Sequence, residues 1–300
     1  MVRFSSIPYG SFVFHNGYDM PKVGLGIARI TDQESLTTAV RAALQSGYRL
    51  FDTARIYDNE HLLGPALKQV LAELGMKRED IFITTKVPIF NDDPAGFTEK
   101  AIKESLERLQ TPYLDLVLIH YPRDRFTGKD DDERNKVHRK IVWQKLEELQ
   151  AKGDCIRSIG VSNYEIFHLV ELLEYAKVVP ALNQCEYHPY LTRKLLRRFC
   201  KDKSIVFQAF SSMLFGEKTI LEQPAVTAAV EKYGVSPHTI LLAYGLLTDA
   251  GIIPKSVNPA RIASNLKDIE KAKLTKDELL ELSQLNTNVN YSDCTPWECI

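Results

Sequence analysis

The sequence lacks the features of a membrane-spanning protein and of a secreted protein held by disulfides. No segment approaches the roughly 20 consecutive apolar residues of a membrane span, and the amino terminus has no apolar run of signal-peptide length. The five cysteines are an odd number scattered through 300 residues, unlike the dense cysteine framework of small secreted domains. We therefore expect reduced thiols and a cytoplasmic protein.

The pattern of a zinc site is also missing. Cys294 and Cys299 lie close together in the tail and could form a disulfide or contribute to a metal site. No second pair of Cys or His residues has the spacing of a zinc finger. We therefore expect no bound metal.

An excess of charge of either sign is absent too. The 38 Lys and Arg residues nearly balance the 39 Asp and Glu residues, which gives a formal net charge of -1. Proteins that bind nucleic acid or an anionic membrane surface usually carry a basic excess or a basic patch. We therefore expect no nucleic-acid or membrane partner but a small-molecule ligand, and the sequence leaves open whether the protein is a monomer or a dimer.

The glycine-rich turn of a doubly wound dinucleotide-binding sheet is incomplete. Gly24 and Gly26 lie in the first strand-like segment, but the third glycine is missing from residues 24–29 and no helix begins directly after them. Strand-like and helix-like segments instead alternate along the chain, which is typical of a parallel sheet with helices outside it. The predicted strands are residues 23–26, 49–52, 81–85, 114–120, 156–160, 181–184, 205–210 and 251–254, and the predicted helices are 32–45, 60–74, 97–109, 133–152, 165–176, 192–202, 237–248 and 259–265.

Eight such units predict a closed (β/α)8 TIM barrel, with residues 1–300 as a single domain. Asn16 and Gly17 stand between apolar flanks, which predicts a β-hairpin before the barrel. The first half of residues 123–140 is polar and mixed in charge, which predicts a long exposed loop.

Ionisable side chains follow three neighbouring predicted strands. Asp52 closes the second strand with Tyr57 five residues further on, and Lys86 and His120 close the next two. The carboxyl ends of barrel strands meet at one rim. A tyrosine with an ordinary pKa of ~10 needs a nearby cation to release its proton near neutral pH, and Lys86, kept charged by Asp52, is the candidate. Singly these residues could be a helix cap, a core ring, a solvated lysine and a buried histidine; together they predict a proton-transfer site.

This quartet resembles the catalytic signature of the aldo-keto reductases, and the resemblance extends along nearly the whole chain. It implies an NADPH-dependent reductase of aldehydes and ketones in which Tyr57 is the general acid and His120 orients the carbonyl oxygen. Residues 160–163 and 182–184 resemble segments that hold the nicotinamide carboxamide, and residues 207–216 resemble a segment whose aromatic residue, here Phe210, stacks on the nicotinamide.

Residues 253–265 resemble the family's segment for the adenosine 2'-phosphate, which implies NADPH rather than NADH. Ser264 stands where many relatives have Glu, so that adenine contact is not carried over. The cofactor contacts implied by the resemblance are Ser162, Asn163, Gln184, Phe210, Ser211, Lys255, Ser256, Val257, Asn258, Arg261 and Asn265.

The resemblance is weaker around the substrate. Ala28 stands where many relatives have an aromatic residue, Tyr121 replaces a more frequent Trp, and Trp297 would come from a C-terminal substrate loop. A mostly apolar pocket lined by these residues together with Tyr57 and His120 does not favour small polar sugars. Two other interpretations remain: a cofactor-binding regulatory subunit with little turnover, and a barrel hydrolase using Asp52 or Glu60, for which the sequence shows neither suitably paired carboxylates nor a metal cluster.

Overall fold

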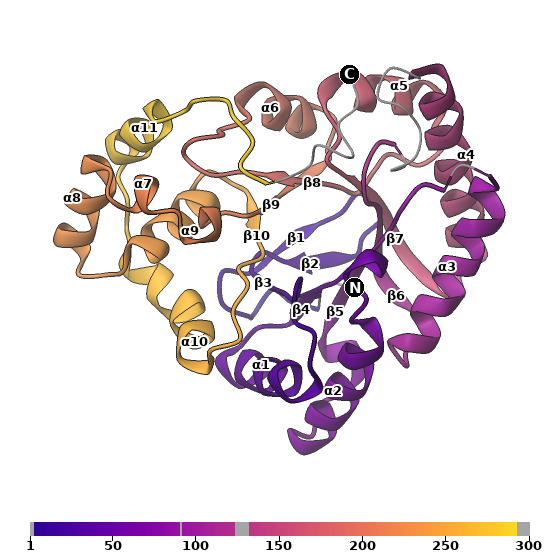
Figure 1. Ribbon diagram of the computed structural model, residues 1–300, viewed down its shortest axis with the longest axis horizontal. Helices are drawn as coiled ribbons and strands as arrows, with labels where there is room; N and C mark the ends of the chain where they lie inside the picture. Colours follow the sequence, from indigo (N-terminus) through magenta and orange to yellow (C-terminus); the bar gives the residue numbers. More distant parts are fainter. Residues whose placement is uncertain (1–2, 91, 124–131, 293–300) are drawn as a thin grey trace.

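The computed structural model describes residues 3–90, 92–123 and 132–292, and its centre is a ring of parallel strands surrounded by helices (Figure 1). Each strand pairs with the next strand along the chain. The strands are β3 (Gly24–Gly26), β4 (Leu50–Asp52), β5 (Phe82–Val87), β6 (Leu114–Ile119), β7 (Ile156–Ser162), β8 (Leu182–Glu186), β9 (Val206–Phe210) and β10 (Gly251–Ile252). All eight predicted strands are present, with ends that differ by a few residues.

The ring closes between its first and last strands. Val23 forms a parallel bridge with Ile252, and Gly26 forms another with Lys255. The side of Gly26 lies against the backbone of Ile253, whose carbonyl oxygen would be 2.9 Å from an added Cβ atom, so a larger residue would push the two strands apart. The predicted (β/α)8 barrel is therefore confirmed.

The helices lie outside the ring of strands (Figure 1), and α1 (Gln33–Ser46) shows typical capping at both ends. This helix begins after Asp32, whose carboxylate accepts from the Ser35 amide, and ends at Gly47 in the left-handed conformation with φ 109°. The helices are α1 (Gln33–Ser46), α2 (Glu60–Glu73), α3 (Pro94–Arg108), α4 (Asp132–Ala151), α5 (Ile166–Tyr175), α6 (Lys194–Asp202), α7 (Lys218–Leu221), α8 (Pro224–Tyr233), α9 (Pro237–Leu247), α10 (Pro259–Lys267) and α11 (Lys276–Gln284). The sequence did not predict α7, α8 and α11, which gather on one side of the molecule.

Short 3-10 turns supplement these helices at η1 (Arg55–Tyr57), η2 (Arg78–Asp80), η3 (Leu214–Gly216) and η4 (Asp268–Lys271). Most of the exposed loop predicted for the first half of residues 123–140 lies outside the described residues, but Arg123 itself is buried. Within the described ranges, no helix has both the length and the apolar character needed to span a membrane. Cys155, Cys185 and Cys200 are free thiols, whereas Cys294 and Cys299 lie outside the described residues.

The predicted hairpin is present and lies at the amino-terminal end of the barrel. Strands β1 (Ser11–Val13) and β2 (Asp19–Pro21) pair antiparallel, and Gly17 takes a positive φ of 84° in the connection. Phe14 and Met20 are buried in a cluster with apolar side chains from inside the barrel. The hairpin therefore fills this end of the barrel, which leaves the carboxyl ends of the strands for a functional site.

A buried ion cluster also ties the amino-terminal end together. Asp115 on β6 is 1% exposed, and its carboxylate lies 2.7 Å from Arg3, 2.6 Å from Arg78 and 3.1 Å from Arg157. The same carboxylate accepts from the Ile83 amide at 3.0 Å. One aspartate thus links the N-terminal segment, η2, β5 and β7, far from the strands' carboxyl ends.

Candidate active site

The carboxyl ends of β4, β5 and β6 bring the predicted quartet together. Lys86 Nζ lies 2.5 Å from Asp52 Oδ1 and 3.3 Å from Tyr57 Oη. The rings of Tyr57 and His120 meet edge to face with centroids 5.7 Å apart. Asp52, Lys86 and His120 are buried, while Tyr57 is half-buried at the end of η1. The four side chains therefore form one contiguous group with Tyr57 toward solvent.

Lys86 remains an ammonium in spite of its burial. Burial by itself lowers the pKa of Lys86, but the Asp52 carboxylate and the Tyr57 hydroxyl outweigh this effect and raise that pKa above its usual value. An ammonium has three N–H donors, and three acceptors surround it: Asp52 Oδ1, Tyr57 Oη and the carbonyl oxygen of Thr53 at 2.9 Å. One N–H is thus directed at the Tyr57 oxygen, where it can stabilise a phenolate.

His120 is a neutral imidazole at neutral pH. Burial and then the positive charge of Lys86 lower the pKa of His120 well below its usual value. The ring stacks on Tyr121 with centroids 4.7 Å apart, and the backbone oxygen of His120 accepts from Asn163 Nδ2 at 2.9 Å. The ring is therefore packed against two aromatic rings, and as a neutral imidazole it has a single N–H to donate.

The predicted carboxamide-binding residues lie beside the quartet. Ser162 ends β7, and its hydroxyl donates to the carbonyl oxygen of Gln184 at 2.8 Å. Asn163 takes the left-handed conformation with φ 62°, and its backbone N–H donates to the same carbonyl oxygen of Gln184 at 2.9 Å. Gln184 Nε2 donates to Asp52 Oδ2 at 2.8 Å, so this group is bonded directly to the quartet.

Sequence reasoning missed Gln208, which also bonds to this group. Its Oε1 accepts from Gln184 Nε2 at 2.8 Å, and the two residues are register partners on β8 and β9. A polar residue inside an otherwise apolar strand segment was the available signal. Its contact with Gln184 depends on which residues face the barrel interior, and that register is not readable from one strand alone.

The predicted phosphate-binding residues surround the start of α10. Asn258 caps this helix by accepting from the Arg261 amide at 3.1 Å, and the Asn258 amide donates to Ser256 Oγ at 3.1 Å. The side chains of Lys255 and Arg261 are exposed. Val257 is also exposed, at 38%, whereas Asn265 is buried. A helix start with two exposed cations is well suited to bind phosphate.

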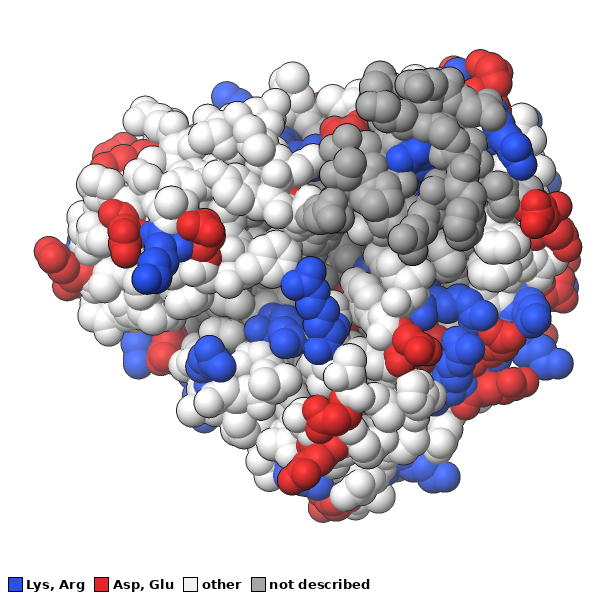
Figure 2. Space-filling model, viewed as in Figure 1, with Lys and Arg blue, Asp and Glu red and all other residues white. Residues whose placement is uncertain are grey.

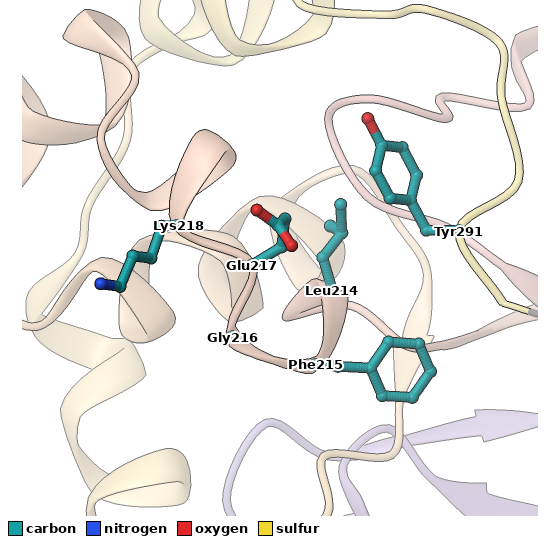
Figure 3. Close-up of a pocket in the computed structure, with 6 residues that line it drawn as sticks. All are labelled: Leu214, Phe215, Gly216, Glu217, Lys218 and Tyr291. Atoms are coloured by element: carbon teal, nitrogen blue, oxygen red, sulfur yellow. The ribbon is translucent and has the colours of Figure 1, made fainter.

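A cavity of about 380 Å³ lies between the segment after β9 and the C-terminal segment (Figure 3). Its lining residues are Leu214, Phe215, Gly216, Glu217, Lys218 and Tyr291. Phe210 and Ser211 stand just before this segment and are half-buried, and Ser211 Oγ lies 3.1 Å from Ser292 Oγ. This hydroxyl pair links the segment after β9 to the C-terminal segment. It lies next to Phe210, the residue predicted to stack on the nicotinamide.

The predicted substrate residues are placed only in part. Ala28 follows β3 and Tyr121 follows β6, so both stand at the carboxyl ends of strands, and both are half-buried. Trp297 lies outside the described residues. Figure 2 shows the surface of the molecule from the same side as Figure 1. Lys and Arg side chains group there beside a hollow near the middle of the visible face.

The two carboxylates named by the hydrolase interpretation, Asp52 and Glu60, are both held by hydrogen bonds. Both oxygens of Asp52 accept hydrogen bonds, from Lys86 and from Gln184. Both oxygens of Glu60 are also occupied, by the hydroxyls of Thr85 at 2.7 Å and Ser105 at 3.0 Å. In the parts of the chain that the structure describes, no group of three or more His, Cys, Asp or Glu residues could hold a metal ion.

The sequence and the fold both match those of known proteins, and the matches agree with one another. Residues 20–287 match the model of the Aldo/keto reductase family. The chain is 40% identical over 273 residues to glyoxal reductase of Bacillus subtilis, covering 91% of each chain. It is 36% identical over 271 residues to methylglyoxal reductase DkgA of Escherichia coli, covering 90% of this chain and 91% of that protein. The crystal structure of a Bombyx mori aldo-keto reductase in complex with NADP is similar with a TM-score of 0.86, at 30% identity and with 97% of each chain covered.

Proposed function

The chain belongs to the aldo/keto reductase family, and from this premise we propose that it reduces aldehydes and ketones with NADPH, with Tyr57 as the proton donor. Family membership makes the protein an NAD(P)H-dependent oxidoreductase that acts on carbonyl groups. The observation that carries the assignment of Tyr57 is the buried ammonium of Lys86, which directs one N–H at the Tyr57 oxygen. We also propose that residues 1–300 form one domain.

The residues around the quartet fit a nicotinamide dinucleotide. Gln184 Oε1 has no hydrogen-bond partner among the described residues, although Gln184 Nε2 has two. Lys255 and Arg261 offer exposed cations at the start of α10, which suits a phosphate group. Asp52 bonds to both Gln184 and Lys86, and Lys86 bonds to Tyr57, so a ring held by Gln184 would lie close to the proposed proton donor.

When bound, NADPH supplies the hydride that reduces the carbonyl carbon. The Tyr57 phenol gives its proton to the carbonyl oxygen, a role that contributes roughly 10²- to 10⁴-fold in general acid catalysis. Lys86 stabilises the phenolate that Tyr57 leaves behind, and Asp52 keeps Lys86 charged and in place. Neutral His120 donates one hydrogen bond that orients the same carbonyl oxygen.

We infer the substrate class from the small, half-buried side chain of Ala28 and from the names of two relatives. Two similar proteins carry the names glyoxal reductase and methylglyoxal reductase, so we propose small dicarbonyls among the substrates, together with bulkier ketones that the small Ala28 side chain would admit. The test is the loss of NADPH absorbance with a panel of aldehydes, diketones and ketoesters. Turnover with any member would reject a purely regulatory subunit, while NADPH binding without turnover across the whole panel would contradict the proposed enzyme.

Neutralising the cations at the start of α10 should change the cofactor preference. In Lys255→Met and Arg261→Ala we expect NADPH to bind roughly tenfold more weakly, because charge-assisted contacts to the 2'-phosphate are lost from an exposed, partly screened site. NADH lacks that phosphate and should bind almost as before. Dissociation constants from fluorescence quenching check this expectation. Lys267→Met, at the other end of the same helix, is the matched control, and an equal loss for both cofactors would remove these cations from the phosphate site.

Filling the space at Ala28 should narrow the substrate range. We expect Ala28→Trp to lower kcat/KM for the bulkiest ketones by about 10- to 100-fold, since overpacking costs about 1 to 3 kcal/mol where atoms collide. Small aldehydes should be spared. The measurement is kcat/KM across a size series, with NADPH affinity determined in parallel. A uniform loss for small and large substrates at unchanged cofactor affinity would show that Ala28 does not line the pocket.

A further inference from the structure

Gln208 is a buried amide in the middle of β9, inside the barrel. Its side chain is fully shielded from solvent, although the remaining residues of the strand are apolar. Burying an amide is costly unless it forms hydrogen bonds. The contacts of Gln208 therefore indicate what this side chain does in the barrel.

One side of the Gln208 amide is bonded well and the other poorly. Gln208 Oε1 accepts from Gln184 Nε2 at 2.8 Å. Gln208 Nε2 has only a weak acceptor within the described residues, the thioether of Met20 at 3.8 Å. The main contribution of Gln208 is thus its acceptor oxygen, and the recipient is Gln184.

The orientation of the Gln184 amide follows from the charges around it. Asp52 Oδ2 belongs to a carboxylate that pairs with Lys86, so the atom of Gln184 facing it at 2.8 Å must be a donor, which is Nε2. This nitrogen has two hydrogens. Asp52 takes one and Gln208 takes the other, so Gln184 has no N–H left for a ligand and its Oε1 is the only group it can offer.

We propose that Gln208 is a positioning residue that fixes Gln184 so that Gln184 Oε1 accepts a hydrogen bond from the carboxamide N–H of the nicotinamide. This inference rests on the proposed function, in which Gln184 contacts the carboxamide. Without the acceptor on Gln208, one N–H of Gln184 is unpaired inside the barrel, and the amide turns to find another partner. Gln208 therefore acts through Gln184 and does not touch the cofactor.

The test uses the oxidised cofactor and its 3-acetylpyridine analogue, in which a methyl group replaces the carboxamide nitrogen and the carbonyl oxygen is kept. The wild-type protein should bind NADP⁺ roughly three- to tenfold more tightly than the analogue, the range that one neutral hydrogen bond gives. In Gln208→Leu we expect NADP⁺ to bind more weakly and the analogue almost as before, so that the ratio falls toward one. Dissociation constants come from fluorescence quenching, with thermal melting as a check of folding.

Three further variants make the result specific. Gln208→Met deletes the amide at nearly the same volume and should behave like Gln208→Leu, which keeps the test valid if the leucine variant folds poorly. Gln208→Glu keeps an acceptor oxygen and should keep the wild-type ratio. Met20→Leu removes the weak partner of Gln208 Nε2 and leaves Oε1 in place, so it should also keep that ratio.

The outcomes separate this inference from the proposed function. An unchanged NADP⁺-to-analogue ratio in both Gln208→Leu and Gln208→Met would overturn the positioning role. A ratio near one in the wild-type protein would also overturn it, because Gln184 Oε1 would then not meet the carboxamide. Failure of the proposed function would look different. The wild-type protein would then bind NADP⁺ more tightly than the 3-acetylpyridine analogue but would reduce none of the carbonyl compounds in the panel.

Discussion

Replacing Tyr57 by phenylalanine is expected to abolish carbonyl reduction while NADPH affinity stays nearly unchanged. In the proposed mechanism the phenol gives the proton but forms no part of the phosphate or carboxamide contacts, and losing a general acid costs roughly 10²- to 10⁴-fold in rate. The phenylalanine ring can keep the edge-to-face contact with His120, because that contact is between the two rings, whose centroids are 5.7 Å apart in the wild type. The measurement is kcat from NADPH consumption, together with the dissociation constant of NADPH.

The control is a tyrosine at the opposite end of the barrel. Tyr113 has a buried hydroxyl without a hydrogen-bond partner in the described structure, so Tyr113→Phe removes the same atom without removing a proton donor from the site. We expect this variant to turn over like the wild type. A Tyr57→Phe protein with near-wild-type kcat would take the general-acid role away from Tyr57, whatever its cofactor affinity.

Removing the carboxylate of Asp115 should destabilise the fold by about 3 kcal/mol, because it leaves three guanidinium groups close together without their anion. Arg3, Arg78 and Arg157 all bond to this one side chain, and the Ile83 amide loses its acceptor as well. The guanidinium groups remain partly exposed, which keeps the loss toward the lower end of the range for broken buried pairs. Urea denaturation of Asp115→Ala gives the free energy of unfolding.

Asp202→Ala is the matched control for the same chemical change. Asp202 pairs with Arg198 on α6, and both side chains are more than half exposed, so the loss should stay below about 1 kcal/mol. Folded Asp115→Ala should keep its kcat, because the ion cluster lies at the end of the barrel away from Tyr57. Equal midpoints for Asp115→Ala and the wild type would mean that the cluster contributes nothing to stability.

The barrel could be predicted from sequence because its strands are short apolar runs that alternate with amphipathic helices. The same alternation explains what was missed, since α8 and α11 stand outside the repeating unit. Their local signals are present: Pro224 opens α8, and Thr275 forms a capping box with Glu278 at the start of α11. Local propensity thus indicated these helices, but the global pattern did not require them.

The quartet could be predicted because each strand of a barrel ends at the same rim, so a residue's place in the sequence gives its place in the site. Gln208 could not, because it lies inside a strand rather than at an end. The role proposed for it depends on the register between β8 and β9 and on Gln184 reaching across the barrel to Asp52. The first contact needs β8 and β9 to pair and the second needs the barrel to form, and a single strand encodes neither of them.

The closure of the barrel has a consequence for how the protein is made on the ribosome. Strand β3 pairs with the two-residue strand β10 region near the other end of the chain, and Tyr48 donates to the carbonyl oxygen of Ile262 across 214 positions of sequence. At a synthesis rate of roughly 5 to 20 residues per second, β3 waits on the order of ten to forty seconds for its partner. During that time its unpaired edge can associate with other nascent chains. Once β10 has been synthesised, it can pair with the β3 region, and the open sheet becomes a closed barrel without an unpaired strand edge.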